Sequence, residues 1–332
     1  MDYVVVVNIS GGVGRTTELA LTANRIDALD RELSRRLQLD GRQPSALLAR
    51  ELQLDQRTVR RRVDRLLDEG VIRIAAVADP RALGYQSMAM VCLTPDAATP
   101  PGEVYAELCA MPEVDYVTRT PGRHAMQAEV MCGSHADLLA LLTEKFESNP
   151  RIRTFEVLLY LRLHYQRAWF SNTNHLSATA GARPTPLDAV DHKMVSLLAE
   201  AGRETFANLA DAIGVSESMA RKRYRALTQR NAMRVVAIAN PLHLGYLATS
   251  WVAITCNSEA GSHRIAEALT QIDEVTYVVL TAGRIDILAE VVCTSHEHLI
   301  SVIDERVRTI TGVGGTEVWP YLDLAYKPLL PL

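Results

Sequence analysis

The sequence contains few of the features that mark membrane, secreted or zinc-binding proteins. No apolar run approaches the ~18 residues that a membrane-spanning helix requires. The five cysteines in 332 residues include no Cys-x-x-Cys pair and no dense cluster, which argues against a disulfide framework and against a zinc site. We therefore expect a reduced, cytoplasmic protein with buried thiols, without a bound metal or cofactor and without membrane attachment.

An overall excess of positive charge is also missing, since the formal net charge is −4. The charge is nevertheless uneven. Residues 25–73 contain 12 arginines and 9 acidic residues, and residues 188–234 contain 8 basic and 6 acidic residues. The remainder of the chain carries a net charge of −9. Nucleic-acid binding depends on where cations gather rather than on their total number. The net charge therefore does not exclude DNA binding by these two segments.

The two basic segments belong to an internal repeat. A shift of 161 residues aligns the chain with itself without a gap, so that Leu83-Gly84-Tyr85 meets Leu244-Gly245-Tyr246. Residues 114–138 and 275–299 are identical at 13 of 25 positions, where chance gives about one or two. The chain therefore contains two copies of a unit of about 140 residues, which is large enough to hold two small domains.

Each copy opens with a predicted helix and continues with two shorter ones. In the second copy, the first helix is predicted to start with a capping box at Thr185, with Pro186 at the first helical position. The shorter helices are predicted at 44–52 and 56–68 in the first copy, and at 205–213 and 217–230 in the second. The break between them is typical of a helix-turn-helix, with Gly214 suited to the turn and Ser216 to the N-cap.

The rest of each copy alternates strands and helices. In the first copy a connecting strand at 71–78 precedes strands at 86–93, 114–120, 124–132 and 152–163, with helices at 102–110 and 134–147. This order, βαββαβ, is the ferredoxin-like arrangement, and the second copy repeats it between 247 and 324. We predict an α+β fold of two tandem units, each with a winged helix-turn-helix and a ferredoxin-like domain.

The domain boundaries follow from this pattern and from one low-complexity stretch. Residues 171–186 are rich in serine, threonine, asparagine and alanine and lack apolar periodicity, which indicates a linker. Residues 11–17 resemble a P-loop, but Arg15 stands where that motif requires lysine, and we interpret them as part of an extension. The predicted segments are an extension (1–24), helix-turn-helix domain 1 (25–78), ferredoxin-like domain 1 (79–166), a linker (167–186), helix-turn-helix domain 2 (187–239) and ferredoxin-like domain 2 (240–328).

The second helix of each predicted helix-turn-helix carries the candidate DNA-binding residues. In helix 56–68, Val59, Val63 and Leu66 cluster on one side, so most of the arginines project from the other. An α-helix fits the major groove of DNA, where arginine pairs with guanine or phosphate. The second copy presents fewer cations there. The candidates are Arg57, Thr58, Arg60, Arg61 and Arg65 in the first copy, and Ser216, Ser218, Arg221, Lys222 and Arg225 in the second.

Taken in order, these motifs resemble the leucine-responsive/asparagine-responsive (Lrp/AsnC) family of regulators. The resemblance rests on the helix-turn-helix, the Asp-Pro-x-x-Leu-Gly-Tyr segment and a Thr-x-Gly-x-x-Asp turn in the βαββαβ domain, and it covers 26–166 and 187–328. It implies a transcription regulator that binds double-stranded DNA, responds to a small molecule and self-associates through its ferredoxin-like domains. The fusion of two units departs from the family and implies a pseudo-dimer within one chain.

The resemblance also implies an effector site at the turn of the second copy. In relatives this turn helps to form a small-molecule pocket between subunits, and amino acids are the usual ligands. Gly283 allows close approach of the backbone, and Asp286 offers a carboxylate to an α-ammonium group; alternatively, Asp286 only caps the hairpin. In the first copy Ala125 replaces the carboxylate. The candidate effector-binding residues are Thr281, Ala282, Gly283, Arg284 and Asp286.

Other polar residues give weaker indications. His296 and His298 would point about 200° apart on a helix, so a shared metal ion is not expected. Glu129 and Glu290 recur as Ala-Glu-Val in the two copies, either as surface charges of a strand or as contacts between subunits. No catalytic residue is identified.

Two alternative functions stay open. Sirohaem decarboxylases share this architecture and also occur as fused pairs. Their His-Asn-Tyr-x-Arg segment and their Asn-Leu-Trp-Phe-like strand have their counterparts here at 115–119, 125–128 and 276–278, and the histidine and the aromatic strand are missing from both copies. The other alternative is an architectural DNA-binding protein that responds to no ligand. The basic helix at 56–68 favours the regulator over the enzyme.

Overall fold

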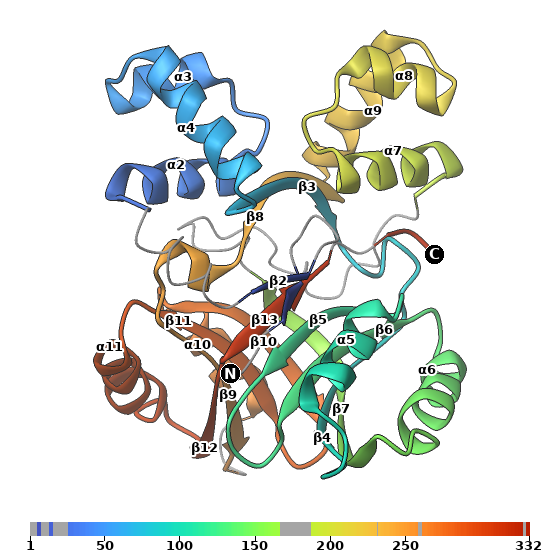
Figure 1. Ribbon diagram of the computed structural model, residues 1–332, viewed down its shortest axis with the longest axis vertical. Helices are drawn as coiled ribbons and strands as arrows, with labels where there is room; N and C mark the ends of the chain where they lie inside the picture. The colour runs from blue at the N-terminus through green and yellow to red at the C-terminus, as the bar shows by residue number, and fades with distance from the viewer. Residues whose placement is uncertain are drawn as a thin grey trace. The chain divides into compact units, whose positions relative to one another are not determined.

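The computed structural model describes residues 5–7, 13–15, 26–166, 187–230, 232–257, 261–327 and 330–332 (Figure 1). These residues form two compact units. One comprises 26–85, 168–239 and 328–332, and the other comprises 1–25, 86–167 and 240–327. The predicted linker at 167–186 lies outside the described residues. So does most of the P-loop-like segment, of which strand β2 (Val13–Arg15) pairs antiparallel with β1 (Val5–Val7).

The first unit contains both helix-turn-helix segments, here called the first and second heads. The first head comprises α2 (Ala28–Leu39), α3 (Ser45–Leu52), α4 (Gln56–Asp68) and strand β3 (Ile72–Ala78). Its core consists of side chains without solvent exposure, among them Leu33, Leu48, Val59, Val63 and Leu66. The predicted apolar side of helix 56–68 is therefore the buried side, which leaves the arginine side to solvent.

The second head repeats this arrangement with α7 (Ala189–Glu200), α8 (Phe206–Ile213), α9 (Glu217–Gln229) and β8 (Met233–Ala239). Gly214 takes the left-handed conformation at φ 75°, and Ser216 caps α9, as predicted. The predicted capping box at Thr185 is wrong. The N-cap of α7 is Asp188, because its carboxylate accepts the backbone N–H groups of Val190 and Asp191.

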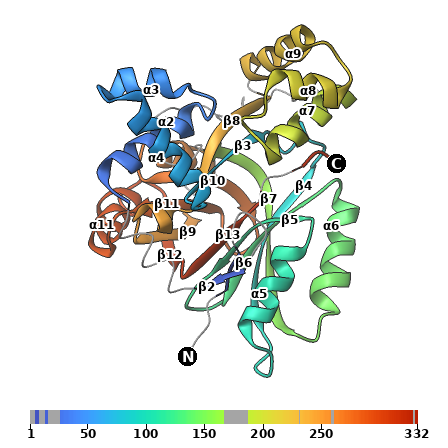
Figure 2. The same ribbon diagram turned by 45° about the horizontal axis from the view of Figure 1, so that its top comes forward.

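Strands β3 and β8 join the two heads. They pair antiparallel along their whole length, from Ile72 opposite Ala239 to Ala78 opposite Met233, and the ribbon is visible in Figures 1 and 2. Two glycines let the backbones approach beside it. A Cβ on Gly41 would lie 2.9 Å from the backbone of Val236, and one on Gly202 would lie 2.6 Å from the Ile74 carbonyl oxygen. The heads thus form one paired body within a single chain.

The second unit contains both ferredoxin-like domains. The first domain comprises β4 (Ser87–Pro95), α5 (Pro101–Ala110), β5 (Val114–Arg119), β6 (Met126–Cys132), α6 (His135–Leu141) with a π-helical turn (Leu142–Glu147), and β7 (Ile152–Gln166). The second comprises β9 (Ala248–Cys256), α10 (Ser262–Leu269), β10 (Val275–Ala282), β11 (Ile287–Cys293), α11 (His296–Ser301) with a π-helical turn (Val302–Val307), β12 (Val313–Pro320) and β13 (Asp323–Tyr326). A short 3₁₀ turn, Pro241–Leu244, precedes it. The predicted α+β fold and the βαββαβ order are confirmed in both copies.

The two domains share one sheet through exchanged strands. The strand order is β12-β9-β11-β10-β7-β4-β6-β5-β13. Strand β7 pairs with β4 of its own copy along its first half and with β10 of the other copy along its second half. The corresponding segment of the second copy is divided into β12, which pairs with β9, and β13, which pairs with β5. Each domain therefore covers an edge strand of the other, and such edges otherwise invite pairing with foreign chains.

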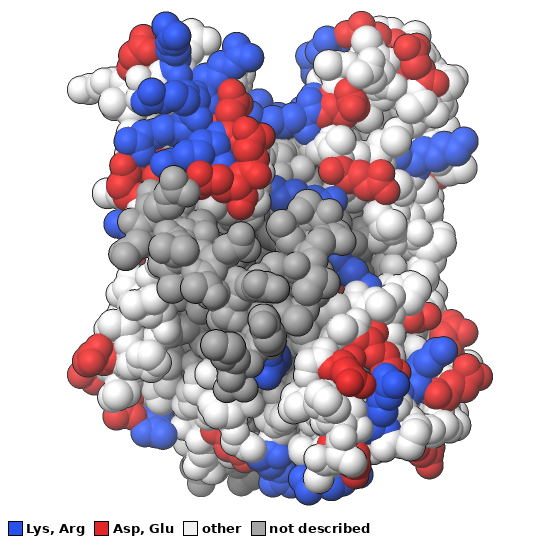
Figure 3. All heavy atoms as spheres, viewed as in Figure 1, with Lys and Arg blue, Asp and Glu red and all other residues white. Residues whose placement is uncertain are grey.

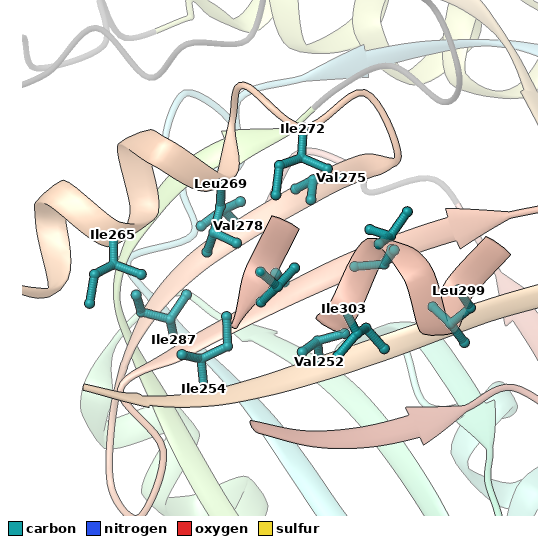
Figure 4. Close-up of a cluster of buried hydrophobic side chains, with 14 of the residues drawn as sticks. Val252, Ile254, Ile265, Leu269, Ile272, Val275, Val278, Ile287, Leu299 and Ile303 are labelled. Carbon is teal, nitrogen blue, oxygen red and sulfur yellow. The ribbon is translucent and has the colours of Figure 1, made fainter. Parts of the chain in front are cut away.

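Helices cover the outer face of this sheet, and each copy has its own apolar core there. In the second copy Ile265 and Leu269 of α10 and Leu299 of α11 pack against Val252 and Ile287 of the strands (Figure 4). The first copy has an equivalent cluster around Val104, Leu108, Leu138 and Phe146. Each ferredoxin-like domain therefore has its own core, to which the exchanged strand β13 adds Ala325 in the first copy.

Polar side chains lie on the other, inner face of the sheet. Glu129 and Glu290 are only 5% and 4% exposed. The Tyr277 hydroxyl donates to Glu129 Oε1 at 3.0 Å, and the Tyr116 hydroxyl donates to Glu290 Oε1 at 2.8 Å. Burial raises the pKa of both carboxyl groups. Of the two interpretations of these acids, surface charge is excluded, because each contacts a tyrosine of the other copy.

Candidate nucleic-acid interface and effector turn

Helix α4 places its candidate DNA contacts at an exposed N-terminal end. The Asp55 carboxylate caps this end by accepting the backbone N–H groups of Arg57 and Thr58 at 2.9 and 3.1 Å. Arg57, Arg60 and Arg61 are exposed, and Thr58 is half-buried. Since an N-cap holds the first turn of a helix in place, these side chains project from a defined backbone.

Arg65 differs from the other candidate arginines. Its Nη2 binds Asp30 Oδ2 at 2.5 Å, and Nη1 of the neighbouring Arg62 binds Asp30 Oδ1 at 2.9 Å. Asp30 has no solvent exposure, and a buried carboxylate needs such partners. In this structure the guanidinium of Arg65 therefore joins α4 to α2, and the cations that extend outward are Arg57, Arg60 and Arg61.

The exposed arginines of α4 form a concentrated basic surface. On the face drawn in Figure 3, lysine and arginine gather over the first head, whereas the second head displays more acidic and uncharged atoms. A shallow hollow in this surface is lined by Arg57, Arg60, Arg61, Asp64, Arg65, Asp68 and Glu69. Such a concentration of cations attracts the phosphates of DNA.

Helix α9 of the second head presents a less basic surface. Arg221 donates to Glu217 Oε1 through Nε at 3.0 Å and Nη2 at 2.5 Å, which offsets its charge. Ser216 caps the backbone of Met219, and its hydroxyl lies 3.0 Å from that of Ser218. Lys222 and Arg225 are exposed. The two heads therefore offer different chemical groups at equivalent positions.

The predicted effector turn joins β10 to β11. Thr281 closes the turn, because its backbone N–H donates to the Asp286 carbonyl at 2.9 Å and its hydroxyl donates to the Ile285 carbonyl at 2.6 Å. Gly283 has φ 140°, and a Cβ there would lie 3.1 Å from Leu158 Cδ2 of the other copy. The Asp286 carboxylate accepts the Cys256 N–H at 2.7 Å. It is half-buried and touches the end of β9, and Ala282 is half-buried as well.

Glu156 of the first copy connects the turns of both copies. Its carboxylate binds Arg284 Nε at 3.1 Å and His124 Nε2 at 3.1 Å, and Arg284 also pairs with Glu317. Burial opposes ionisation of Glu156, but hydrogen bonds from Arg284 and His124 outweigh it and hold its pKa below the usual value. Sequence reasoning missed this residue. The available signal was an acid at the same repeat position in both copies, Glu156 and Glu317.

The remaining sequence candidates lie away from these sites. His298 Nε2 contacts Glu274 Oε1 at 3.1 Å, and Glu274 also binds Arg306. Within the part of the chain that the structure describes, no three histidine, cysteine or acidic side chains gather as metal ligands. Cys132 and Cys293 are buried, and burial raises their pKa values to about 11 and about 12. None of the described helices is long and apolar enough to cross a bilayer.

The two paired heads, one of which carries a basic recognition helix, are typical of a DNA-binding regulator. So is the combination of these heads with ferredoxin-like domains. The family model for the Lrp/AsnC ligand binding domain matches residues 86–170 and 248–324. The AsnC-type helix-turn-helix model matches 187–228, and a winged helix-turn-helix DNA-binding model matches 26–73. The chain belongs to the Lrp/AsnC family of transcription regulators.

Individual relatives correspond in length to about one copy. An uncharacterised HTH-type transcriptional regulator of Pyrococcus abyssi is 34% identical over 133 residues, which are 40% of this chain and 84% of the relative. The regulatory protein AsnC of Haemophilus influenzae is 26% identical over 140 residues, which are 42% of this chain and 93% of AsnC. Relatives of this length agree with the duplication read from the sequence.

One solved structure is similar along nearly the whole chain. The siroheme decarboxylase NirDL covers 91% of this chain and 94% of its own, with a TM-score of 0.57 and 17% sequence identity. At that identity the likeness shows the fold alone, which this chain shares with NirDL along both copies. It carries no statement about chemistry.

Proposed function

We propose that this protein is a one-component transcription regulator whose two heads read unlike half-sites of an asymmetric operator. The observation that carries the proposal is the difference between α4 and α9. Arg57, Arg60 and Arg61 extend from the first, whereas Ser218 and Lys222 extend from the second. Because operator symmetry mirrors protein symmetry, two unlike heads joined in one chain match an operator that is bound in one orientation.

The first head supplies most of the electrostatic affinity in this proposal. Arg57 and Arg61 project from the first turns of α4, where a recognition helix meets base edges in the major groove. Each cation that neutralises a phosphate also releases counterions, so binding weakens as salt rises. In the second head the Glu217 carboxylate offsets Arg221, and Lys222 and Arg225 supply the contacts to phosphate.

The effector in this proposal is an amino acid held at the turn of the second copy. Asp286 would bind the α-ammonium group, since a carboxylate is a strong acceptor for a charged donor. The first copy would carry no such site, because Ala125 offers no charge. We further propose that the protein is not an enzyme, uses no cofactor, acts in the cytoplasm and forms homo-oligomers through its ferredoxin-like domains.

Selection of bound duplexes from a random DNA pool tests the operator, with and without each of the twenty amino acids. The expected result for the wild type is an asymmetric consensus. When the Arg57→Ala/Arg61→Ala double variant is used, the half-site of the first head is expected to be less frequent among the selected duplexes. Recovery of perfect palindromes only would contradict the proposal. Salt-dependent binding without any consensus would instead favour the architectural protein.

The fold shared with NirDL over 91% of the chain leaves one second candidate to test, a sirohaem-decarboxylase-like enzyme. Titration of the protein with sirohaem, followed by visible absorbance, distinguishes the two. The regulator is expected to leave the absorbance spectrum of the tetrapyrrole unchanged. A saturable spectral shift at one equivalent, followed by loss of carboxylate groups, would support the enzyme.

A further inference from the structure

Arg42 of the first copy contacts the second head. It lies in the turn after α2, and its guanidinium reaches two backbone carbonyls of the other copy. Nη1 donates to the Gly202 carbonyl at 2.8 Å, and Nη2 donates to the Glu204 carbonyl at 2.7 Å. Both carbonyls belong to the segment that leads into α8. A planar guanidinium with two parallel donors holds such a segment in one orientation.

The same guanidinium also packs against aromatic rings of the second head. Its central carbon lies 4.9 Å from the ring centroid of Phe206 on α8 and 5.5 Å from that of Tyr224 on α9. The two rings meet edge to face, with centroids 5.3 Å apart. Arg42 therefore touches both helices of the second helix-turn-helix.

The corresponding contact in the opposite direction is weaker. Arg203, which is the repeat partner of Arg42, donates through Nε to the Gly41 carbonyl at 2.8 Å. Its Nη2 is buried and has no hydrogen-bond partner among the described residues. Ser45 and Val63 stand where the second head has Phe206 and Tyr224, so these two positions offer Arg203 no aromatic ring. Arg42 therefore makes more contacts with the opposite head than Arg203 makes.

We propose that Arg42 determines the spacing between the two half-sites that the protein accepts. The β3–β8 ribbon alone is a two-stranded structure, and such ribbons twist and are marginally stable by themselves. Arg203 and Arg73, whose Nη2 donates to the Ala199 carbonyl at 2.7 Å, also join the heads. Arg42 differs from them because it touches both helices of the second helix-turn-helix, next to the residues proposed to contact DNA. Because half-sites repeat with the 10–10.5 base pairs of a DNA turn, a fixed separation of two recognition helices selects one spacing. The inference rests on the proposed function, in which both heads read DNA.

The experiment uses the full chain and the operator obtained by pool selection. Operators with one to five base pairs inserted or deleted between the half-sites are compared by fluorescence anisotropy. For the wild type, a wrong spacing removes simultaneous binding of both heads, which lowers affinity by about 10²–10⁴-fold. Arg42→Ala is expected to flatten this profile, so that neighbouring spacings bind within about threefold of one another, with weaker binding at the best spacing.

Matched variants separate spacing from folding. Arg203→Ala is expected to keep the wild-type spacing profile, because its partner head has no ring pair. Phe206→Leu leaves the hydrogen bonds of Arg42 in place and is expected to flatten the profile partly. Affinity for DNA that contains a single half-site is expected to remain unchanged in Arg42→Ala and Arg203→Ala, since a loss there would mean that Arg42 only supports the fold of a head. Phe206→Leu is compared by its spacing profile alone, because the guanidinium of Arg221 also lies 4.5 Å from the Phe206 ring centroid.

The outcomes distinguish the inference from the function on which it rests. A wild-type spacing profile for Arg42→Ala, with both half-sites recovered in selection, overturns the role of Arg42 alone. Loss of single-half-site binding by Arg42→Ala also overturns it. If selection with the wild type recovers one half-site only, the proposed reading of DNA by two heads is what fails.

Discussion

Asp115 and Thr276 occupy equivalent positions of the two copies, but they interact differently with the equivalent glutamates Glu129 and Glu290. The Thr276 hydroxyl donates to Glu290 Oε2 at 2.5 Å. Asp115 instead places a second carboxyl group next to Glu129. Burial, and then the charge of Glu129, raise the pKa of Asp115 well above its usual value. The first copy therefore buries a pair of acids where the second buries an acid with a hydroxyl donor.

This difference predicts a pH-dependent stability that belongs to the first copy. The folded pKa of Asp115 is raised, so its contribution to stability is complete below about pH 4, the pKa of an unfolded aspartate. The contribution is lost as pH rises through the raised folded value. The groups around the pair are Tyr160, Tyr277, Glu290 and Lys327. Burial raises the pKa values of the two tyrosines above 10, so the acids titrate before the tyrosines, and burial lowers the pKa of Lys327.

Asp115→Thr, which copies the second copy, is expected to reduce this loss of stability. The measurement is the difference between variant and wild type in urea unfolding free energy from pH 5 to pH 9. Groups whose pKa is lowered in the fold, such as Asp27 and His124, contribute equally to both proteins and cancel. Thr276→Asp is the matched control, expected to steepen the dependence. Parallel curves for all three proteins would refute the prediction.

Asp30 is expected to be the most costly single acid to remove from the first head. Asp30→Ala leaves Arg62 and Arg65 without their shared buried partner, and breaking such a pair typically costs about 3–5 kcal/mol. Asp64, whose carboxylate lies 3.7 Å from Arg60 at the surface, serves as the control, because exposed pairs contribute about 0–1 kcal/mol. Urea unfolding measures both. Equal losses for the two variants would contradict the buried role of Asp30.

We expect some arginines of α4 to contact DNA and Arg65 to stabilise the first head. Arg57→Ala and Arg61→Ala should each weaken operator binding by about 1–3 kcal/mol if base contacts are lost, without loss of stability. Arg65→Ala should lower the unfolding free energy, because Arg65 binds Asp30. Anisotropy at several salt concentrations distinguishes base from phosphate contacts, since losing a phosphate contact lowers the salt slope. An Arg65→Ala variant of wild-type stability with impaired operator binding would show that Arg65 reads DNA directly.

Asp286 is expected to be required for the response to the effector. Asp286→Asn keeps an acceptor for the Cys256 N–H but lacks the charge that an α-ammonium group needs. It should therefore abolish amino-acid binding in calorimetry while leaving ligand-free DNA binding intact. Asp286→Ala removes both roles and should also lower the melting temperature. Unchanged ligand affinity in Asp286→Asn would leave Asp286 with the hairpin-capping role alone.

The two copies and the local structure of each copy can be predicted from the order of residues alone. Helix α4 spans 56–68 as predicted, because its apolar side and its N-cap act within a few residues along the chain. Gly214 and Ser216 mark the turn before α9 for the same reason. The helix predicted at 134–147 begins at His135, but its second half is a π-helical turn, which apolar spacing does not distinguish from a regular helix.

Which copy each strand pairs with, and which side chain each buried charge contacts, depends on how the folded chain packs. Strand β7 pairs with strands of both copies. Strands such as β6 are buried on both faces, so the pattern of their side chains does not predict which strand lies beside them. The same holds for Glu129, whose partner Tyr277 lies 148 residues away, and for Arg65, whose partner Asp30 lies 35 residues away. Local periodicity reports which side of an element is buried, whereas the partner of a buried charge depends on how distant segments pack.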